Sequence, residues 1–360
     1  MIYLLDVIYM YYNMPPQTPY NPYYGNSFYM DPQEYIKQNE RKKLRKTSNG
    51  IGFYIMAYFL TMQTVAIVIA LVFSSLNLDT SNPTAEYLLD IFLSVVASFI
   101  PGLIYLGASK FKISEAFKKT YVPIGLLLSL VFIGMALAMV SNVAAQMLDD
   151  NLSIFGLENS ASMSNDQALN PLQTFLYIFA VSAVPAFAEE FAFRGIVMGR
   201  LRKYGNCFAI VTSAVMFGAM HGNTTQIVFA FILGLVFGFV DCVADSIIPS
   251  IIIHFLNNFY AVTFDVLKTN TNIDDKTYYI INLSVVVLFC VAGLISFLYL
   301  TGRNKNIFKL SSKDKSENEY SDLMTYKEKF KAFFLTPGVI ISLVLFLITT
   351  VSFLIPGLNL

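Results

Sequence analysis

The chain has 360 residues, of which 56% are hydrophobic and 13% are charged, and its formal net charge is zero. Soluble domains carry about 25% charged residues, and one of this length could not bury so much apolar surface, so the composition predicts an integral membrane protein. The basic residues flank apolar segments instead of forming a stripe, so no nucleic-acid partner is expected. Three widely spaced cysteines without a CxxC pair indicate neither a disulfide framework nor a thiolate zinc site.

Residues 1–50 differ in composition from the rest of the chain. Their first part is rich in Pro, Tyr and Asn and lacks the aliphatic residues that would form a core. A basic cluster over 37–46 comes just before the first apolar segment, where anionic lipid is its expected partner. We therefore predict a disordered Tyr/Pro-rich and basic arm on the cytosolic side of the membrane.

The remaining residues contain a series of apolar segments long enough to be considered as membrane spans. A helix needs about 20 apolar residues to cross a bilayer. Loops rich in Lys and Arg alternate with loops that lack them, which places the N-terminus in the cytosol. Because 207–221 is short, we predict eight or nine transmembrane helices in an all-α, polytopic bundle. The segments are 51–76, 87–108, 121–147, 171–200, 207–221, 225–244, 247–267, 278–301 and 337–356.

This count gives a domain organisation. The membrane domain covers 51–301, a charged cytosolic loop covers 302–336, and an additional C-terminal span lies within 337–360. The location expected for such a chain is a bacterial plasma membrane, since nothing in the sequence indicates a eukaryotic context.

Two adjacent carboxylates, Glu189 and Glu190, lie within the fourth apolar segment together with Arg194. A charged side chain inside a bilayer costs on the order of 2.5–3.5 kcal/mol, so such residues indicate function. Glu190 and Arg194 are four residues apart on one helical face and can pair. Glu189 lies about 100° around the helix and is not neutralised by this pair, which makes it the better candidate for a general base.

The only two histidines of the chain, His221 and His254, follow in later segments. Glu189 and His221 are each fourteen residues from the turn at 203–207, so both should lie about 21 Å from that turn and level with each other. His254 and Asn258 share one face of the next helix that starts in the cytosol. We predict that Glu189, His221, His254 and Asn258 meet at one pocket that holds water.

This set of residues suits hydrolysis of an amide bond by activated water. A carboxylate and an imidazole can take a proton from water, and an imidazole and a carboxamide can donate to the oxyanion that develops. A divalent metal would serve as well, because Glu189, His221 and His254 are enough ligands for a catalytic zinc. The sequence leaves both mechanisms, with and without a metal, open.

Three motifs in order, EExxxR at 189–194, FxxxH at 217–221 and HxxxN at 254–258, resemble those of the CPBP family, also called Abi. This family includes type II CAAX prenyl endopeptidases and bacteriocin-processing or immunity proteins, and the resemblance covers about 171–260. It implies a membrane endopeptidase with its protease core at about 171–267. It also implies that Glu189 is the base, that His221 aids water activation, and that His254 and Asn258 form the oxyanion hole, with Glu190 and Arg194 as structural support.

The expected substrate is a membrane peptide, or a prenylated or precursor protein. Two other functions fit the same motifs. The chain could be a non-catalytic scaffold or bacteriocin-immunity protein that retains them, or a proton-coupled transporter in which Glu189 and His221 relay protons.

Other polar residues of the apolar segments are assigned structural roles. Asp241, Asp245 and Asp265 are expected at helix ends near the membrane surface. Asn257 points to a different face of the helix from Asn258 and is expected to form a hydrogen bond between helices.

Overall fold

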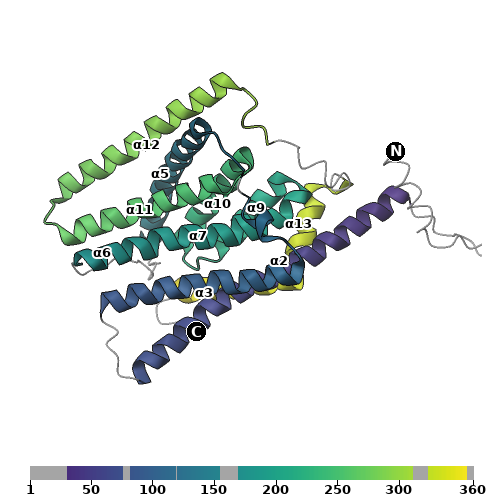
Figure 1. Cartoon of the computed structure of the whole chain (residues 1–360), viewed down its shortest axis with the longest axis horizontal. Helices are drawn as coiled ribbons and strands as arrows, with labels where there is room; N and C mark the ends of the chain where they lie inside the picture. Colours follow the sequence, from purple (N-terminus) through teal and green to yellow (C-terminus); the bar gives the residue numbers. More distant parts are fainter. Residues whose placement is uncertain (1–30, 76–81, 119, 155–168, 311–322, 355–360) are drawn as a thin grey trace, which may run out of the picture.

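The computed structural model of the chain describes residues 31–75, 82–118, 120–154, 169–310 and 323–354. All regular elements in these ranges are helices, which confirms the predicted all-α bundle (Figure 1). The main helices are α2 (Pro32–Ser75), α3 (Pro83–Ser109), α4 (Ile113–Ala116), α5 (Ile124–Ile154), α9 (Asn206–Ala219), α10 (Thr224–Ala244), α11 (Ile248–Asn270), α12 (Asp275–Arg303), α13 (Tyr326–Phe334) and α14 (Pro337–Leu354). The remaining span is divided into α6 (Pro171–Ile178), η1 (Phe179–Ala183), α7 (Val184–Glu190), η2 (Phe191–Met198), α8 (Gly199–Leu201) and η3 (Arg202–Tyr204).

Seven helices in the described ranges are long and apolar enough to cross a membrane, and the number is eight if α13 and α14 form one bent span. The short segment 207–221, which decided between eight and nine predicted spans, corresponds to α9, which has 14 residues. At a rise of 1.5 Å per residue α9 is about 21 Å long, less than the hydrocarbon thickness of about 30 Å. The described residues therefore contain at most eight membrane-spanning helices. Helix α9 packs within the bundle but is too short to cross the membrane.

The first described helix begins earlier than the sequence analysis placed it. Residues 32–50, which we assigned to the disordered arm, are the first part of α2, whereas 1–30 lie outside the described residues. This part of α2 is rich in Glu, Gln, Lys and Arg, which are residues with a high intrinsic helix propensity. The helical arm is also held by tertiary contacts, because Leu44 and Ser48 are buried and Lys37 Nζ lies 2.7 Å from Glu328 of α13. A helix also occupies part of the predicted loop 302–336, since α13 lies within it.

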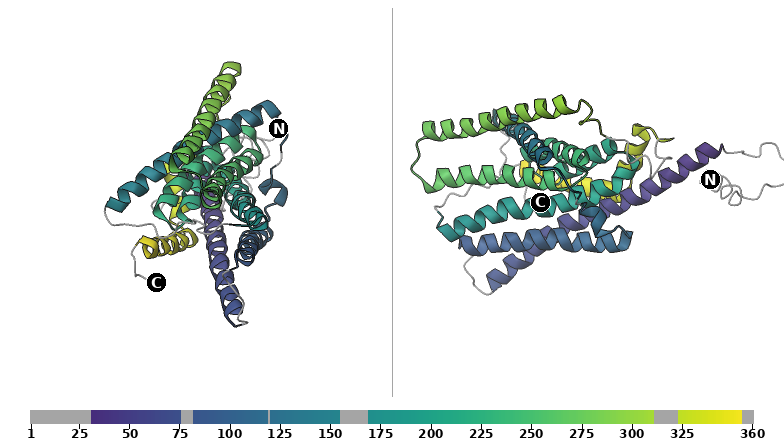
Figure 2. Two further views of the ribbon diagram at one scale, coloured as in Figure 1. Left: turned by 90° about the vertical axis from the view of Figure 1, so that its left-hand side faces the viewer. Right: turned by 45° about the horizontal axis from the view of Figure 1, so that its top comes forward.

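The helices form two groups around α9 and α10 (Figures 1 and 2). On one side α2 packs against α3 and α14, and on the other side α5 packs against α12. Helix α10 contacts both α9 and α5, and α11 contacts α10, α5 and the segment from α6 to α7. The span that carries the two glutamates therefore lies in the interior of the bundle, between α3 and α11.

Helices α2 and α14 cross at two glycines. A Cβ added to Gly338 would lie 2.5 Å from the carbonyl oxygen of Asn49, and one added to Gly52 would overlap the backbone of Gly338. The N–H of Gly338 also donates to Asn49 Oδ1 at 2.8 Å. Small residues that let two helix backbones approach are a common basis of packing in membranes. The C-terminal span is thus fixed to the first span.

This crossing gives the first prediction. We expect Gly52→Ala to lower the free energy of unfolding by about 1–3 kcal/mol, because the new methyl group meets backbone that cannot rotate away. The measurement is thermal loss of helical circular dichroism in detergent. The matched control is Gly107→Ala in α3, where an added Cβ meets no described atom within 4 Å. Equal melting of the two variants would contradict the close crossing.

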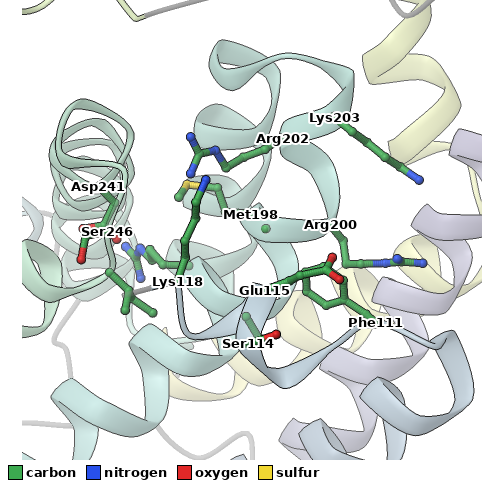
Figure 3. Close-up of a pocket in the computed structure, with 14 residues that line it drawn as sticks. Phe111, Ser114, Glu115, Lys118, Met198, Arg200, Arg202, Lys203, Asp241 and Ser246 are labelled. Atoms are coloured by element: carbon green, nitrogen blue, oxygen red, sulfur yellow. The ribbon is translucent and has the colours of Figure 1, made fainter. Parts of the chain in front are cut away.

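A cavity of about 380 Å³ lies at one end of the bundle (Figure 3). Its walls come from the α3–α4 connection and α4, from the end of η2 through α8 into η3, and from the end of α10 with the α10–α11 connection. We call it the basic pocket, because five cationic side chains line it together with two acidic ones. These are Lys118, Arg194, Arg200, Arg202 and Lys203, with Glu115 and Asp241.

Candidate active site

The span from α6 to η3 is interrupted by two π-helical segments, η1 and η2, on either side of α7. Pro185 has no N–H with which to close a helical hydrogen bond to Val181, so the Val181 carbonyl needs another donor. Asn258 Nδ2 of α11 donates to this carbonyl at 3.1 Å. Single-turn π segments often mark functional sites, and here they set the orientation of the short helix that carries Glu189 and Glu190.

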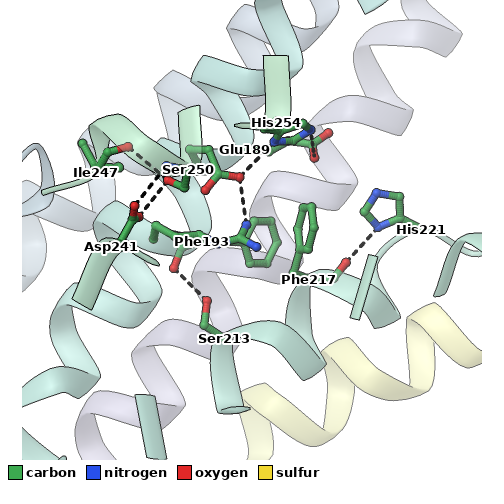
Figure 4. Close-up of polar contacts among 11 residues, drawn as sticks. Glu189, Phe193, Ser213, Phe217, His221, Asp241, Ile247, Ser250 and His254 are labelled. Atoms are coloured by element: carbon green, nitrogen blue, oxygen red, sulfur yellow. Dashed lines mark hydrogen bonds and ion pairs between the residues drawn. The ribbon is translucent and has the colours of Figure 1, made fainter. Parts of the chain in front are cut away.

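Figure 4 shows the polar contacts around Glu189 and His254. The neighbouring Glu190 is fully buried and binds two partners through its Oε1. Arg194 Nη1 lies 3.0 Å from Glu190 Oε1, which agrees with the predicted pair four residues apart. His254 Nδ1 lies 2.9 Å from the same oxygen, a contact that the sequence analysis did not include. The Arg194 guanidinium is also held between the rings of Phe217 and Phe237, at 4.3 and 4.9 Å from their centroids.

Glu189 lies on the other side of the same imidazole. Its Oε2 is 3.9 Å from His254 Nε2, and its side chain is 19% exposed. An ionised Glu190 can only accept, so His254 Nδ1 carries the hydrogen in their bond and Nε2 faces Glu189. A separation of 3.9 Å is too long for a direct hydrogen bond but suits two groups that contact one water molecule. The structure therefore brings Glu189 and His254 together as predicted.

His221 and Asn258 are less directly connected to this pair. His221 Nδ1 lies 2.8 Å from the carbonyl oxygen of Phe217, and no hydrogen bond or ion pair joins His221 to Glu189 within the described residues. The ring of Phe217 contacts both imidazoles edge-on, with centroids 4.9 Å from His221 and 6.2 Å from His254. His221 Nε2 and the second N–H of the Asn258 carboxamide are the groups that these two residues can still offer to a substrate.

The three proposed metal ligands do not form a ligand set in this structure. Among the residues that the structure describes, no group of three or more His, Cys, Asp or Glu side chains is close enough to hold a metal ion. Glu189 and His254 are near each other, but Phe217 packs against the ring of His221. The arrangement of these side chains thus does not fit the zinc site that the sequence left open, and the roles proposed for them do not involve a metal.

A comparison with known protein families gives a match to the region that contains the candidate site. The family model described as type II CAAX prenyl endopeptidase Rce1-like matches residues 171–260, which is the extent of the sequence resemblance. The matched residues form an Rce1-like domain that covers a quarter of the chain. No curated protein and no solved structure gives a significant match to the chain. The chain is therefore an integral membrane protein with a domain similar to CAAX-type endopeptidases.

Within the Rce1-like domain the structure reveals one polar contact that the sequence analysis missed. Asp241 is 2% exposed, and its carboxylate accepts the N–H of Ser250 at 3.1 Å and the hydroxyl of Ser250 at 2.7 Å. Asp241 thus caps the first turn of α11, the helix that carries His254. The expectation of an interfacial Asp241 was wrong, because its position near a helix end is covered by the α10–α11 turn. The signal available in the sequence was an Asp followed nine residues later by a Ser near the start of the next predicted helix.

The structural roles predicted for Asp245 and Asn257 agree better with the structure. Asp245 at the end of α10 is 2.7 Å from Lys118 and 3.2 Å from Arg202. Asn257 accepts from Asn142 of α5 at 3.2 Å, which is the predicted hydrogen bond between helices.

The Asp241 cap gives the second prediction. We expect Asp241→Ala to lower the free energy of unfolding by about 1–2 kcal/mol, because the buried N–H of Ser250 loses its acceptor and the hydroxyl of Ser250 keeps only the Ile247 carbonyl, at 3.0 Å. Asp241→Asn, which keeps one carbonyl oxygen, should lose less. Thermal loss of helical circular dichroism measures both. A stability of Asp241→Ala equal to that of the wild type would show that the cap does not hold α11.

Proposed function

We propose that the chain hydrolyses a peptide bond of a membrane-associated or lipid-modified substrate by water activated at Glu189. The observation that carries the proposal is the position of His254, held at Nδ1 by buried Glu190 while Nε2 faces Glu189 at 3.9 Å. A carboxylate orienting an imidazole in this way recurs in hydrolytic sites. Its location in the part of the chain that matches the Rce1-like model supports the proposal further.

The proposed roles follow from the donors and acceptors of each group. Glu189 takes a proton from the attacking water, since it is the carboxylate that the Arg194 pair does not neutralise, and returns this proton to the amine nitrogen when the C–N bond of the tetrahedral intermediate breaks. His254, when protonated, pairs with Glu190 through Nδ1 and donates from Nε2 to the oxyanion of the tetrahedral intermediate. Asn258 donates its second N–H to the same oxyanion. His221, with hydrogen on Nδ1, offers Nε2 as an acceptor to the water.

The substrate class is proposed from the family description. A prenylated protein with a C-terminal CAAX sequence, or a membrane peptide precursor in a bacterial plasma membrane, presents its cleavable bond close to the bilayer. With the N-terminus in the cytosol, the basic ends of the spans face the cytosolic lipid surface, in agreement with the positive-inside rule. Anionic lipid is the proposed partner of the basic cluster at 37–46.

The test is cleavage of peptides by the purified full chain in lipid nanodiscs. We expect a farnesylated CAAX peptide to be cut behind the prenylated cysteine, and the same peptide without the lipid to be cut more slowly. In heavy-oxygen water the new carboxylate should carry one heavy oxygen atom, which mass spectrometry detects. Binding of either peptide without cleavage would favour the scaffold or immunity function, and proton flux into liposomes without cleavage would favour the transporter.

A further inference from the structure

The basic pocket contains buried donors whose partners do not come from the described part of the chain. The Arg194 side chain is 1% exposed, and its Nε and Nη2 have no hydrogen-bond partner among the described residues. Arg200 Nε is likewise buried without a described partner. A buried donor left unsatisfied costs about 1–3 kcal/mol. An anionic group with several oxygens, entering the pocket from outside the chain, would satisfy these donors.

The charges that line the pocket are only partly compensated within the described residues. Lys118 and Arg202 share Asp245, at 2.7 and 3.2 Å, and Arg194 Nη1 binds Glu190. Arg200 forms a side-chain hydrogen bond with Tyr105, and Glu40, which is not part of the cavity lining, attracts Lys203.

Only two acidic side chains, Glu115 and Asp241, line the cavity beside its five cationic ones. The carboxylate of Asp241 already accepts both donors of Ser250. The lining of the cavity itself is therefore predominantly cationic, which favours an anion.

The position and the apolar wall of the pocket indicate the source of this anion. Figure 3 shows Phe111 and Met198 among the cationic side chains, and Ile247 also lines the cavity. The pocket lies where α3, α8, α10 and α11 reach one end of the bundle. Basic pockets between membrane helices are typical sites for anionic lipid headgroups. Guanidinium groups match phosphate oxygens in geometry as well as in charge.

We propose that the basic pocket binds the phosphate group of an anionic phospholipid. The cationic side chains hold the phosphate, and the apolar wall formed by Phe111, Met198 and Ile247 contacts the glycerol and the first carbons of the chains. This site is separate from the proposed catalytic residues, because none of Glu189, His221, His254 and Asn258 lines the cavity. The proposal therefore does not depend on the proposed peptidase function.

The test measures binding of a short-chain lipid, dihexanoyl phosphatidylglycerol, to the full chain in detergent by native mass spectrometry. Dihexanoyl phosphatidylcholine and inorganic phosphate are titrated in parallel. We expect the anionic lipid to bind more tightly than either, and the double variant Arg200→Gln/Lys203→Gln to weaken it about 30-fold, from about 1 kcal/mol per cation. The control Lys305→Gln/Lys309→Gln removes two exposed cations outside the pocket and should change binding less than about threefold.

A second measurement tests whether the lipid binds in the basic pocket. The chain has no tryptophan, so Phe111→Trp introduces a single indole into the pocket wall, and its emission should change as the anionic lipid saturates. Equal affinity for the two lipids, an equal loss in the control variant, or binding without an emission change would each overturn the proposal. Phosphate that competes as well as the lipid would reject a lipid as the source of the anion.

Discussion

We expect Glu189→Gln to lower the rate of peptide cleavage by about 10²–10⁴-fold, the range that general-base catalysis contributes. The variant removes the carboxylate that faces His254 Nε2 at 3.9 Å and keeps the shape of the side chain. Its stability should be close to that of the wild type, because Glu189 is partly exposed and forms no hydrogen bond within the described residues. The measurements are single-turnover cleavage of the farnesylated peptide and thermal loss of helical circular dichroism.

The control for this variant is Glu86→Gln, an exposed glutamate in the first turn of α3. It removes the same charge outside the candidate site and should leave cleavage unchanged. Cleavage by Glu189→Gln at the wild-type rate would show that another group is the base. A loss of activity accompanied by an equally large loss of stability would instead give Glu189 a structural role.

The fold was largely predictable because its signal is local. Long apolar segments predict membrane helices whatever their neighbours are. The described ranges have such helices at seven of the nine predicted places, and at eight if α13 and α14 form one bent span. The exception, α9, was also the weakest by length. The start of α2 was missed because the charged residues of 32–50 suggested solvent, whereas their helix is fixed by α13 and α14, more than 270 residues further along the chain.

The candidate site was predictable only where sequence spacing determines geometry. The Glu190–Arg194 pair follows from the helical repeat and is present at 3.0 Å. The bond between Glu190 and His254 joins residues 64 positions apart and depends on how α11 packs against α7. Asn258 was expected to face the substrate, but the carbonyl left without a partner by Pro185 takes one of its hydrogens. Long-range packing thus decided which groups meet.

The second large effect concerns the buried pair itself. We expect Arg194→Met to lower the free energy of unfolding by about 3–5 kcal/mol, because it leaves Glu190 as a buried carboxylate without its cation. Glu190→Gln should destabilise by a similar amount, since it leaves the guanidinium of Arg194 between Phe217 and Phe237 with no negative partner. Both side chains are at most 1% exposed, so solvent cannot compensate for the loss.

The double variant Glu190→Gln/Arg194→Met separates stability from catalysis. Removing both charges leaves neither unpaired, so most of the lost unfolding free energy should return, with a strongly non-additive double-mutant cycle. Cleavage should stay low, because a neutral glutamine cannot stabilise protonated His254 as the carboxylate does at 2.9 Å. Thermal loss of helical circular dichroism in detergent measures the stability, and single-turnover cleavage measures the catalytic rate. Additive destabilisation would show that the pair is not coupled, and full activity of the double variant would show that Glu190 does not support His254.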